Sequence, residues 1–184
     1  MLNRLALSAL LIFPFGLAAH AQPGPASKLV SRTLPGQAIA VSRTPWETLA
    51  NLGGAWRIAV PRTAAEKAFR IRMRPISRTT ALLETFGNPA GVTTETVYHR
   101  DGGNIMATHY CAQGNQPRLL LSSTSTPSRL SFNFHDITNL GTKADSHLVK
   151  IEFNVIDDDH LERRETYTQN GIDEETTLRL KRVW

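Results

Sequence analysis

The sequence contains a single cysteine, Cys111, among its 184 residues. One cysteine cannot form a disulfide within the chain, which excludes a small scaffold stabilised by disulfides. Beyond the first twenty residues, no apolar stretch is long enough to cross a bilayer as a helix. Tight metal-binding spacings such as H-E-x-x-H or C-x-x-C are also missing. The chain is about the length of one domain, so packing and hydrogen bonds must hold that domain together.

The N-terminus has the three parts of a secretion signal. Arg4 supplies a positive charge, residues 5–18 form an apolar run, and residues 19–21 read A-H-A, an A-x-A cleavage site. The run is too short for a membrane anchor, and no cysteine follows it to carry a lipid. We therefore predict a signal peptide at 1–21, cleaved after Ala21, and a periplasmic or secreted mature protein.

Charge is distributed unevenly along the chain, whose formal net charge is +5. Residues 22–100 hold eleven Lys and Arg against four Asp and Glu, whereas residues 101–184 hold nine against twelve. The excess of basic residues has two interpretations, a solvated strand face or a module that binds an anionic envelope component through Arg70, Arg72 and Arg74. No motif of a nucleic-acid-binding module is present, so we predict no nucleic-acid partner.

A short helix is expected before the first strand. Residues 22–43 are rich in Pro, Gly, Ser and Ala, which predicts a flexible lead-in. Thr44 suits the N-cap, Pro45 suits the first helical position, and Glu47 completes a capping box. The glycine pair at 53–54 then ends the helix.

From residue 55 onward, apolar and polar residues alternate with a period of two, which is typical of strands with one buried face. Phe69, Ile71 and Met73, for example, alternate with three arginines. Turn sequences separate the runs, at residues 87–89, 101–103, 126–128, 157–159 and 170–171. The pattern predicts nine or ten short antiparallel strands, in a sandwich or a closed barrel. Because the faces opposite the apolar rows are charged, we expect a soluble barrel and no membrane insertion.

Two motifs resemble known β-barrel families. Residues 54–56, GAW, look like the G-x-W opening of lipocalins and related calycins, in which a basic residue of the last strand packs over the Trp. Arg179, Lys181 and Arg182 are the candidates for that residue. Residues 108–118, THYCAQGNQPR, resemble the signature of a family of often secreted bacterial calycin-like proteins. The resemblance implies one all-β, calycin-like barrel over residues 44–184; the family has no established activity, so function stays open.

The polar stretch around Cys111 also supplies the candidate site. We predict that the barrel binds a small, partly apolar ligand, with Arg118 holding a carboxylate or phosphate. The alternative is a network of hydrogen bonds that only stabilises an irregular turn. The candidate ligand-binding residues are Tyr98, His109, Cys111, Asn115, Arg118 and His147.

Catalysis and metal binding are further possibilities. An enzyme would use Cys111 as nucleophile and His109 as base, although no nucleophile elbow or oxyanion loop is recognisable. A buried structural thiol is the competing interpretation. Metal or haem would need His109, Cys111, His135 and His147 to converge, and haem-binding barrels of the nitrobindin type place a His near the C-terminus, where this chain has none. We therefore predict no catalytic residues, no metal and no cofactor.

Overall fold

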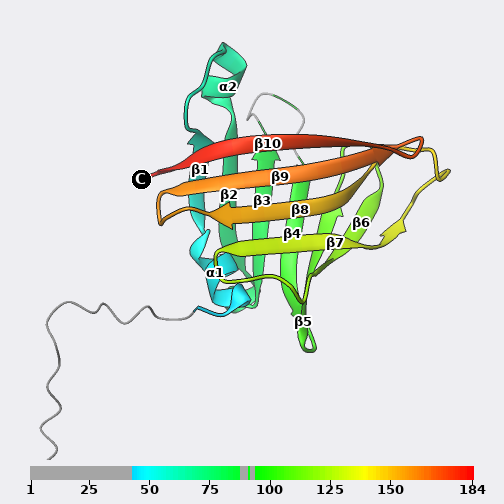
Figure 1. The fold of residues 1–184 in the computed structure, drawn as a ribbon, viewed down its shortest axis with the longest axis horizontal. Coiled ribbons are helices and arrows are strands. Elements are labelled where there is room, and N and C mark those ends of the chain that lie inside the picture. The colour runs from blue at the N-terminus through cyan, green and yellow to red at the C-terminus, as the bar shows by residue number, and fades with distance from the viewer. Residues whose placement is uncertain (1–42, 88–90, 92–93) are drawn as a thin grey trace, which may run out of the picture. The chain divides into compact units, whose positions relative to one another are not determined.

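The computed structural model describes residues 43–87, 91 and 94–184 (Figure 1). The predicted signal peptide and the predicted lead-in up to residue 42 lie outside the described residues. The same is true of Asn88 and Pro89, which belong to the predicted turn at 87–89.

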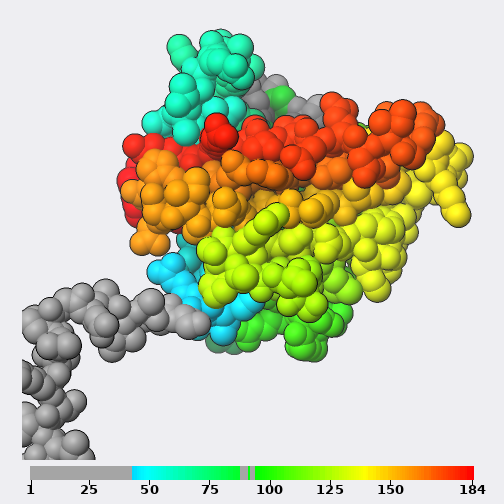
Figure 2. All heavy atoms as spheres, viewed as in Figure 1, coloured from blue at the N-terminus to red at the C-terminus, as the bar shows by residue number. Residues whose placement is uncertain are grey.

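The described residues form a closed barrel of ten antiparallel strands, in which each strand pairs with its neighbour in sequence and β1 pairs with β10. This confirms the predicted all-β, calycin-like single barrel. In Figure 1, β7–β10 run across β2–β5, and Figure 2 shows β7–β10 as a continuous surface above which α2 projects. The elements are α1 (Pro45–Asn51), β1 (Gly54–Ile58), α2 (Ala64–Ala68), β2 (Arg70–Ile76), η1 (Ser77–Thr79), β3 (Ala81–Gly87), β4 (Thr94–Asp101), β5 (Asn104–Tyr110), β6 (Gln116–Leu121), β7 (Arg129–Thr138), β8 (His147–Val155), β9 (His160–Gln169) and β10 (Ile172–Val183).

The helix α1 begins with the predicted capping box. The Thr44 side chain accepts a hydrogen bond from the Glu47 backbone N–H, and the Glu47 carboxylate accepts one from the Thr44 backbone N–H. Leu49 and Leu52 are buried in the core of the barrel. The indole Nε1 of Trp56 donates to the carbonyl of Leu52 at 2.9 Å, which ties α1 to the first strand.

A second helix, α2, was not predicted from the sequence. Thr63 and Glu66 form another capping box, but none of the residues of α2 is buried. Without an apolar face the segment has no helical periodicity to detect, so only the capping residues marked it. In the described residues no helix is long and apolar enough to cross a membrane.

The hairpin turns lie where the sequence placed them. The turns at 101–103 and 170–171 connect β4 to β5 and β9 to β10. Asn170 and Gly171 both have positive φ, as a tight two-residue hairpin requires. The turn at 157–159 connects β8 to β9, and residues 126–128 precede β7.

Two irregularities interrupt the alternation. The β6–β7 register shifts between Arg118 and Leu119, and the β8–β9 register shifts between Leu148 and Lys150. The second shift pairs Leu148 with Tyr167 and buries Leu148 completely. The alternation of Val149, Ile151, Phe153 and Val155 along this strand predicts that Leu148 lies on the opposite, polar face. The structure shows that this prediction is wrong, because the bulge turns the residues before it to the other face.

Candidate functional site

The middle of the barrel is filled by side chains. The rings of Tyr98, Phe132 and Phe153 meet edge to face, with centroids 5.3 to 6.5 Å apart. All three are fully buried, as are Leu119 and Ile151. A void large enough for water would expose part of such residues, so these layers pack as a solid core.

A buried ionic cluster lies among these rings. Arg163 is 1% exposed and Glu84 0%, and Arg163 Nη2 lies 2.9 Å from Glu84 Oε1. Arg163 Nη1 donates to Glu165 Oε2 at 2.6 Å, and its guanidinium lies 4.7 Å from the centre of the Phe86 ring. Burial alone would lower the pKa of Arg163, but the carboxylates of Glu84 and Glu165 raise it overall. Arg163 therefore stays charged inside the barrel.

Tyr98, a predicted ligand-binding residue, belongs to this cluster. Its hydroxyl donates to Glu84 Oε2 at 2.7 Å. Burial, together with the nearby Glu84 carboxylate, raises the pKa of Tyr98 well above its usual value. Its hydroxyl is thus a fixed hydrogen-bond donor to the ionic cluster.

His109 occupies a neighbouring inward position. Its Nδ1 lies 2.9 Å from Thr96 Oγ1, and its Nε2 lies 3.1 Å from the Tyr167 hydroxyl. Burial and the charge of Arg163 lower the pKa of the imidazole to about 4. At neutral pH His109 is therefore uncharged, with both nitrogens engaged.

Cys111 is connected to His109 through Tyr167. Its Sγ lies 3.8 Å from the Tyr167 hydroxyl and contacts Gln113 Oε1. Burial, with the nearby Glu165 carboxylate, raises the pKa of Tyr167. The thiol of Cys111 and the imidazole of His109 are thus linked in one series of hydrogen bonds. The Tyr167 hydroxyl lies between them, so they do not bond to each other directly.

The other three predicted site residues do not take part in this series of hydrogen bonds. Asn115 Nδ2 donates to the carbonyl of Ser146 at 2.9 Å, and His147 Nδ1 bonds to the carbonyl of Asp145 at 2.8 Å. Arg118 makes a two-pronged ion pair with Asp136, its Nε donating to Oδ1 at 2.6 Å. This pair holds the pKa of Asp136 below its usual range. In this arrangement the anionic partner of Arg118 is a side chain of the protein itself.

Metal coordination needs several ligands at one point. Within the part of the chain that the structure describes, no group of three or more His, Cys, Asp or Glu side chains is placed to hold an ion. His135 lies beside Asp136, its Nε2 4.0 Å from the carboxylate, and so does not join His109 and Cys111.

One end of the barrel is closed by α1 and by Trp56. The guanidinium of Arg182 lies 4.2 Å from the centre of the Trp56 ring, which identifies it among the three basic candidates of the last strand. Its Nη2 donates to the carbonyl of Asn51 and its Nε to that of Asp158. Such a cation–π contact contributes about 0.5–2 kcal/mol.

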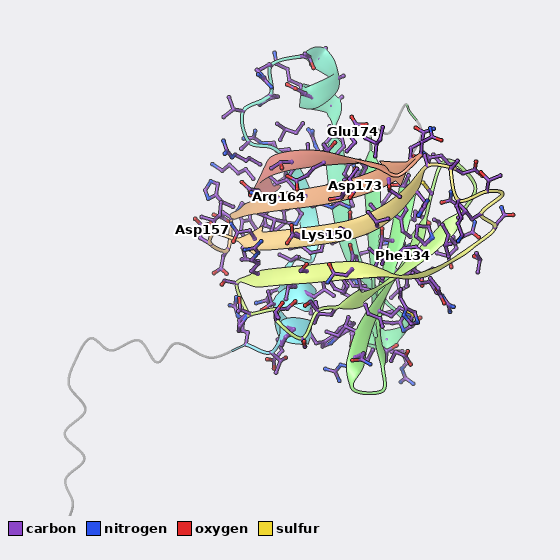
Figure 3. All side chains as sticks on the ribbon, turned by 45° about the vertical axis from the view of Figure 1, so that its right-hand side comes forward. Phe134, Lys150, Asp157, Arg164, Asp173 and Glu174 are labelled. Carbon is purple, nitrogen blue, oxygen red and sulfur yellow. The ribbon has the colours of Figure 1, made fainter. Side chains whose placement is uncertain are left out.

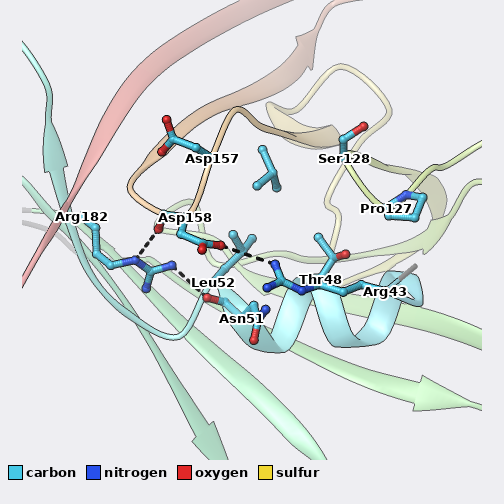
Figure 4. Close-up of a pocket in the computed structure, with 10 residues that line it drawn as sticks. Arg43, Thr48, Asn51, Leu52, Pro127, Ser128, Asp157, Asp158 and Arg182 are labelled. Carbon is cyan, nitrogen blue, oxygen red and sulfur yellow. Dashed lines mark hydrogen bonds and ion pairs between the residues drawn. The ribbon is translucent and has the colours of Figure 1, made fainter. Parts of the chain in front are cut away.

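Beside this closure the structure has a pocket of about 640 Å³ (Figure 4). In Figure 4, Thr48 and Asn51 of α1 and the following residue Leu52 lie opposite Pro127 and Ser128, with Asp158 alongside. A second cavity, of about 550 Å³, flanks the start of α1 and includes Ser123. The α1 end of the barrel is therefore hollowed on both sides of the helix.

Thr48 places an unusual polar group beside the larger pocket. The residue is 4% exposed and borders the pocket, but its hydroxyl oxygen is itself fully buried and has no hydrogen-bond partner in the protein. Buried hydroxyls without a partner are uncommon, because leaving one unpaired costs about 1–3 kcal/mol. Arg43 lies at the rim, 3.5 Å from the exposed carboxylate of Asp158.

Sequence reasoning missed both the buried ionic cluster and this pocket. The signal for the cluster was a charge at an inward position, since Glu84 stands between Leu82 and Phe86 in the alternation of β3. The pocket had no such signal, because segments far apart in the sequence line it.

No protein-family model matches this sequence, and a search of curated proteins finds no match either. The family resemblance of residues 108–118 therefore stays a prediction.

Proposed function

We propose that this protein is an exported binding protein that takes up a small, partly apolar ligand at the α1 end of its barrel. The observation that carries the proposal is the pocket of about 640 Å³, whose lining combines apolar side chains with Arg43 at the rim. Pockets of about 300–1,000 Å³ are typical of small-molecule sites. The N-terminal signal pattern supports the export.

The position of this site differs from the one expected from the sequence. The inward residues Tyr98 and His109 have almost no exposed surface, and their polar atoms are bonded to other side chains. A ligand there would have to displace a packed core. The pocket beside α1 needs no such displacement, which favours it as the binding site.

The lining indicates the chemistry of the ligand. Leu52, Pro127 and Val155 offer apolar surface for its body. Arg43 would attract an acidic group, because its ion pair with Asp158 is exposed and therefore weak. An apolar molecule with one acidic group fits this arrangement when that group is held at Arg43, away from Asp157 and Asp158, which also line the pocket.

The dye 1-anilinonaphthalene-8-sulfonate has that chemistry and serves as a probe. We expect saturable binding that enhances its fluorescence. Arg43→Gln removes the cation at the rim of the pocket, so it should weaken binding about two- to fivefold. Ser128→Trp should block the pocket and abolish binding, since Ser128 lines it and is exposed.

Ser123→Trp is the matched control, because it fills the second cavity on the other side of α1. Binding should survive this substitution. Dye binding that both tryptophan variants leave unchanged would contradict the proposal, as would the absence of saturable binding. Mass spectrometry of the protein under native conditions would identify a ligand that co-purifies with it.

A further inference from the structure

The outward face of β1, β2 and the end of β10 carries a group of cations that the fold brings together. Arg57 on β1 pairs directly with Lys181 on β10, and Ala55 pairs with Arg72 on β2. Directly paired residues point to the same side of a sheet, with Cβ atoms about 4.5–5.5 Å apart. Arg70 and Arg74 share the side of Arg72, being two residues before and after it. We call Arg57, Arg70, Arg72, Arg74 and Lys181 the basic face.

No carboxylate neutralises the basic face. Among residues 43–87, 91 and 94–184, none of the ion pairs involves its members. Arg57 and Arg70 instead donate to backbone carbonyls, Arg57 to Ile58 and Arg70 to Lys67. Residues 1–42 and 88–93 contain no Asp or Glu, so the undescribed segments supply no carboxylate either.

Some cations elsewhere on the barrel are paired with carboxylates, as the surface formed by β7, β8 and β9 shows. There Glu152 is 3.1 Å from Lys150 and 3.3 Å from Arg129, and Glu162 is 2.6 Å from Arg164. Figure 3 shows Lys150 and Arg164 on these strands. Like charges on paired strands are destabilising, so the basic face lowers stability where mixed charges would not.

Exposed apolar side chains lie at the edge of the basic face. Val183 pairs with Ala55 and is therefore on the same side as Lys181. Trp184, which follows Val183, is 92% exposed; its ring lies against Arg182, which points to the Trp56 side of β10, so Trp184 is at the end of the barrel next to the basic face. Tryptophan prefers the boundary between lipid headgroups and hydrocarbon.

We propose that the basic face binds the surface of a bilayer that contains anionic phospholipids, with Trp184 in the headgroup layer. The cations of the basic face would attract the anionic headgroups by charge alone. The exposed Trp184 and Val183 gain from a lipid surface and would gain little from a hydrated polyanion. The barrel would lie on the membrane without entering it.

Sedimentation with vesicles tests the proposal on the full mature chain. We expect binding to phosphatidylcholine vesicles containing about a quarter phosphatidylglycerol and none to pure phosphatidylcholine. High salt should weaken the binding. R72Q/R74Q/K181Q should reduce the partition coefficient by a factor of about 100–200, because each basic residue near an anionic surface contributes about fivefold. Trp184→Ala should weaken binding while leaving its salt dependence intact.

The matched control R129Q/K150Q/R164Q removes three charges from the surface of β7, β8 and β9 and should bind within a few-fold of wild type. Circular dichroism would confirm that each variant is folded. Equal losses in the two triple variants would overturn the proposal, because net charge alone would then explain binding. Equal binding to pure phosphatidylcholine would also overturn it, as would binding to heparin or duplex DNA but not to vesicles.

Discussion

Arginine side chains occupy two opposite electrostatic settings in this barrel. Arg163 is buried between the carboxylates of Glu84 and Glu165. Arg72 and Arg74, on the basic face, have no ion pair among the described residues. Removing a charge from water is costly unless an opposite charge replaces the lost solvation, whereas a surface charge keeps its water. A cation in the interior therefore needs a carboxylate beside it. A cation on the surface does not, and it stays available to a binding partner.

The largest expected change in stability comes from removing the buried charge of Arg163. Arg163→Met leaves Glu84 and Glu165 without their cation in the core. We expect the free energy of unfolding to fall by about 3–5 kcal/mol, measured by urea denaturation. Arg72→Met, its surface counterpart, should change stability by less than about 0.5 kcal/mol.

If Arg163→Met does not fold, R163M/E84M/E165M replaces the whole cluster by apolar side chains. This variant should regain part of the loss, since no charge remains buried. If Arg163→Met were as stable as the wild type, Arg163 would not be needed to balance the charges of Glu84 and Glu165.

A smaller effect is expected from pH, because His109 faces the charge of Arg163. Its pKa is lowered to about 4 from an ordinary value of 6.5. The folded state thus favours the neutral imidazole, and the unfolded chain binds the extra proton between these values. Stability from this residue is complete above pH 6.5 and falls as the pH drops toward 4, by about 3 kcal/mol.

Unfolding by urea at a series of pH values measures this dependence. In His109→Gln the free energy of unfolding should change little between pH 6.5 and 4. It should still fall below pH 4, because the carboxylates become protonated there. Identical curves for both proteins would show that His109 does not titrate in this way.

The smallest effect is expected on the basic face. In R57Q/K181Q the like-charged pair across β1 and β10 is removed, and stability should rise by about 0.2–1 kcal/mol. Thermal unfolding at low salt measures the change. A loss of stability would mean that these side chains are structural, which would also weaken the case for a binding face.

Much of the fold was predictable because its signals are local. Thr44 and Glu47 marked α1, and the glycine and asparagine turns marked the hairpins. The arginines of β2 alternate with buried Ile71 and Met73 as a half-buried strand requires. Each of these features depends on residues only a few positions apart.

The candidate site was less predictable because it depends on distant residues. Glu84 and Arg163 are on β3 and β9, and only closure of the barrel makes them partners. Arg118 seemed a ligand anchor because Asp136, its partner, lies on the next strand. The bulge at Leu148 left no mark in an alternation that reads equally well with either face inward.

The pairing of β1 with β10 has a consequence for how the barrel closes. Ala55 and Val183 are neighbours in the sheet but are separated by about 130 residues. Until β10 is in place, β1 leaves the sheet with an open edge, which is a template for pairing with another chain. Contacts between residues this far apart in the sequence form slowly, because the entropy of closing a long loop is lost before they are made. Closure by the final hairpin is therefore expected to be the slow step of folding, and the chain is most prone to aggregate before that step.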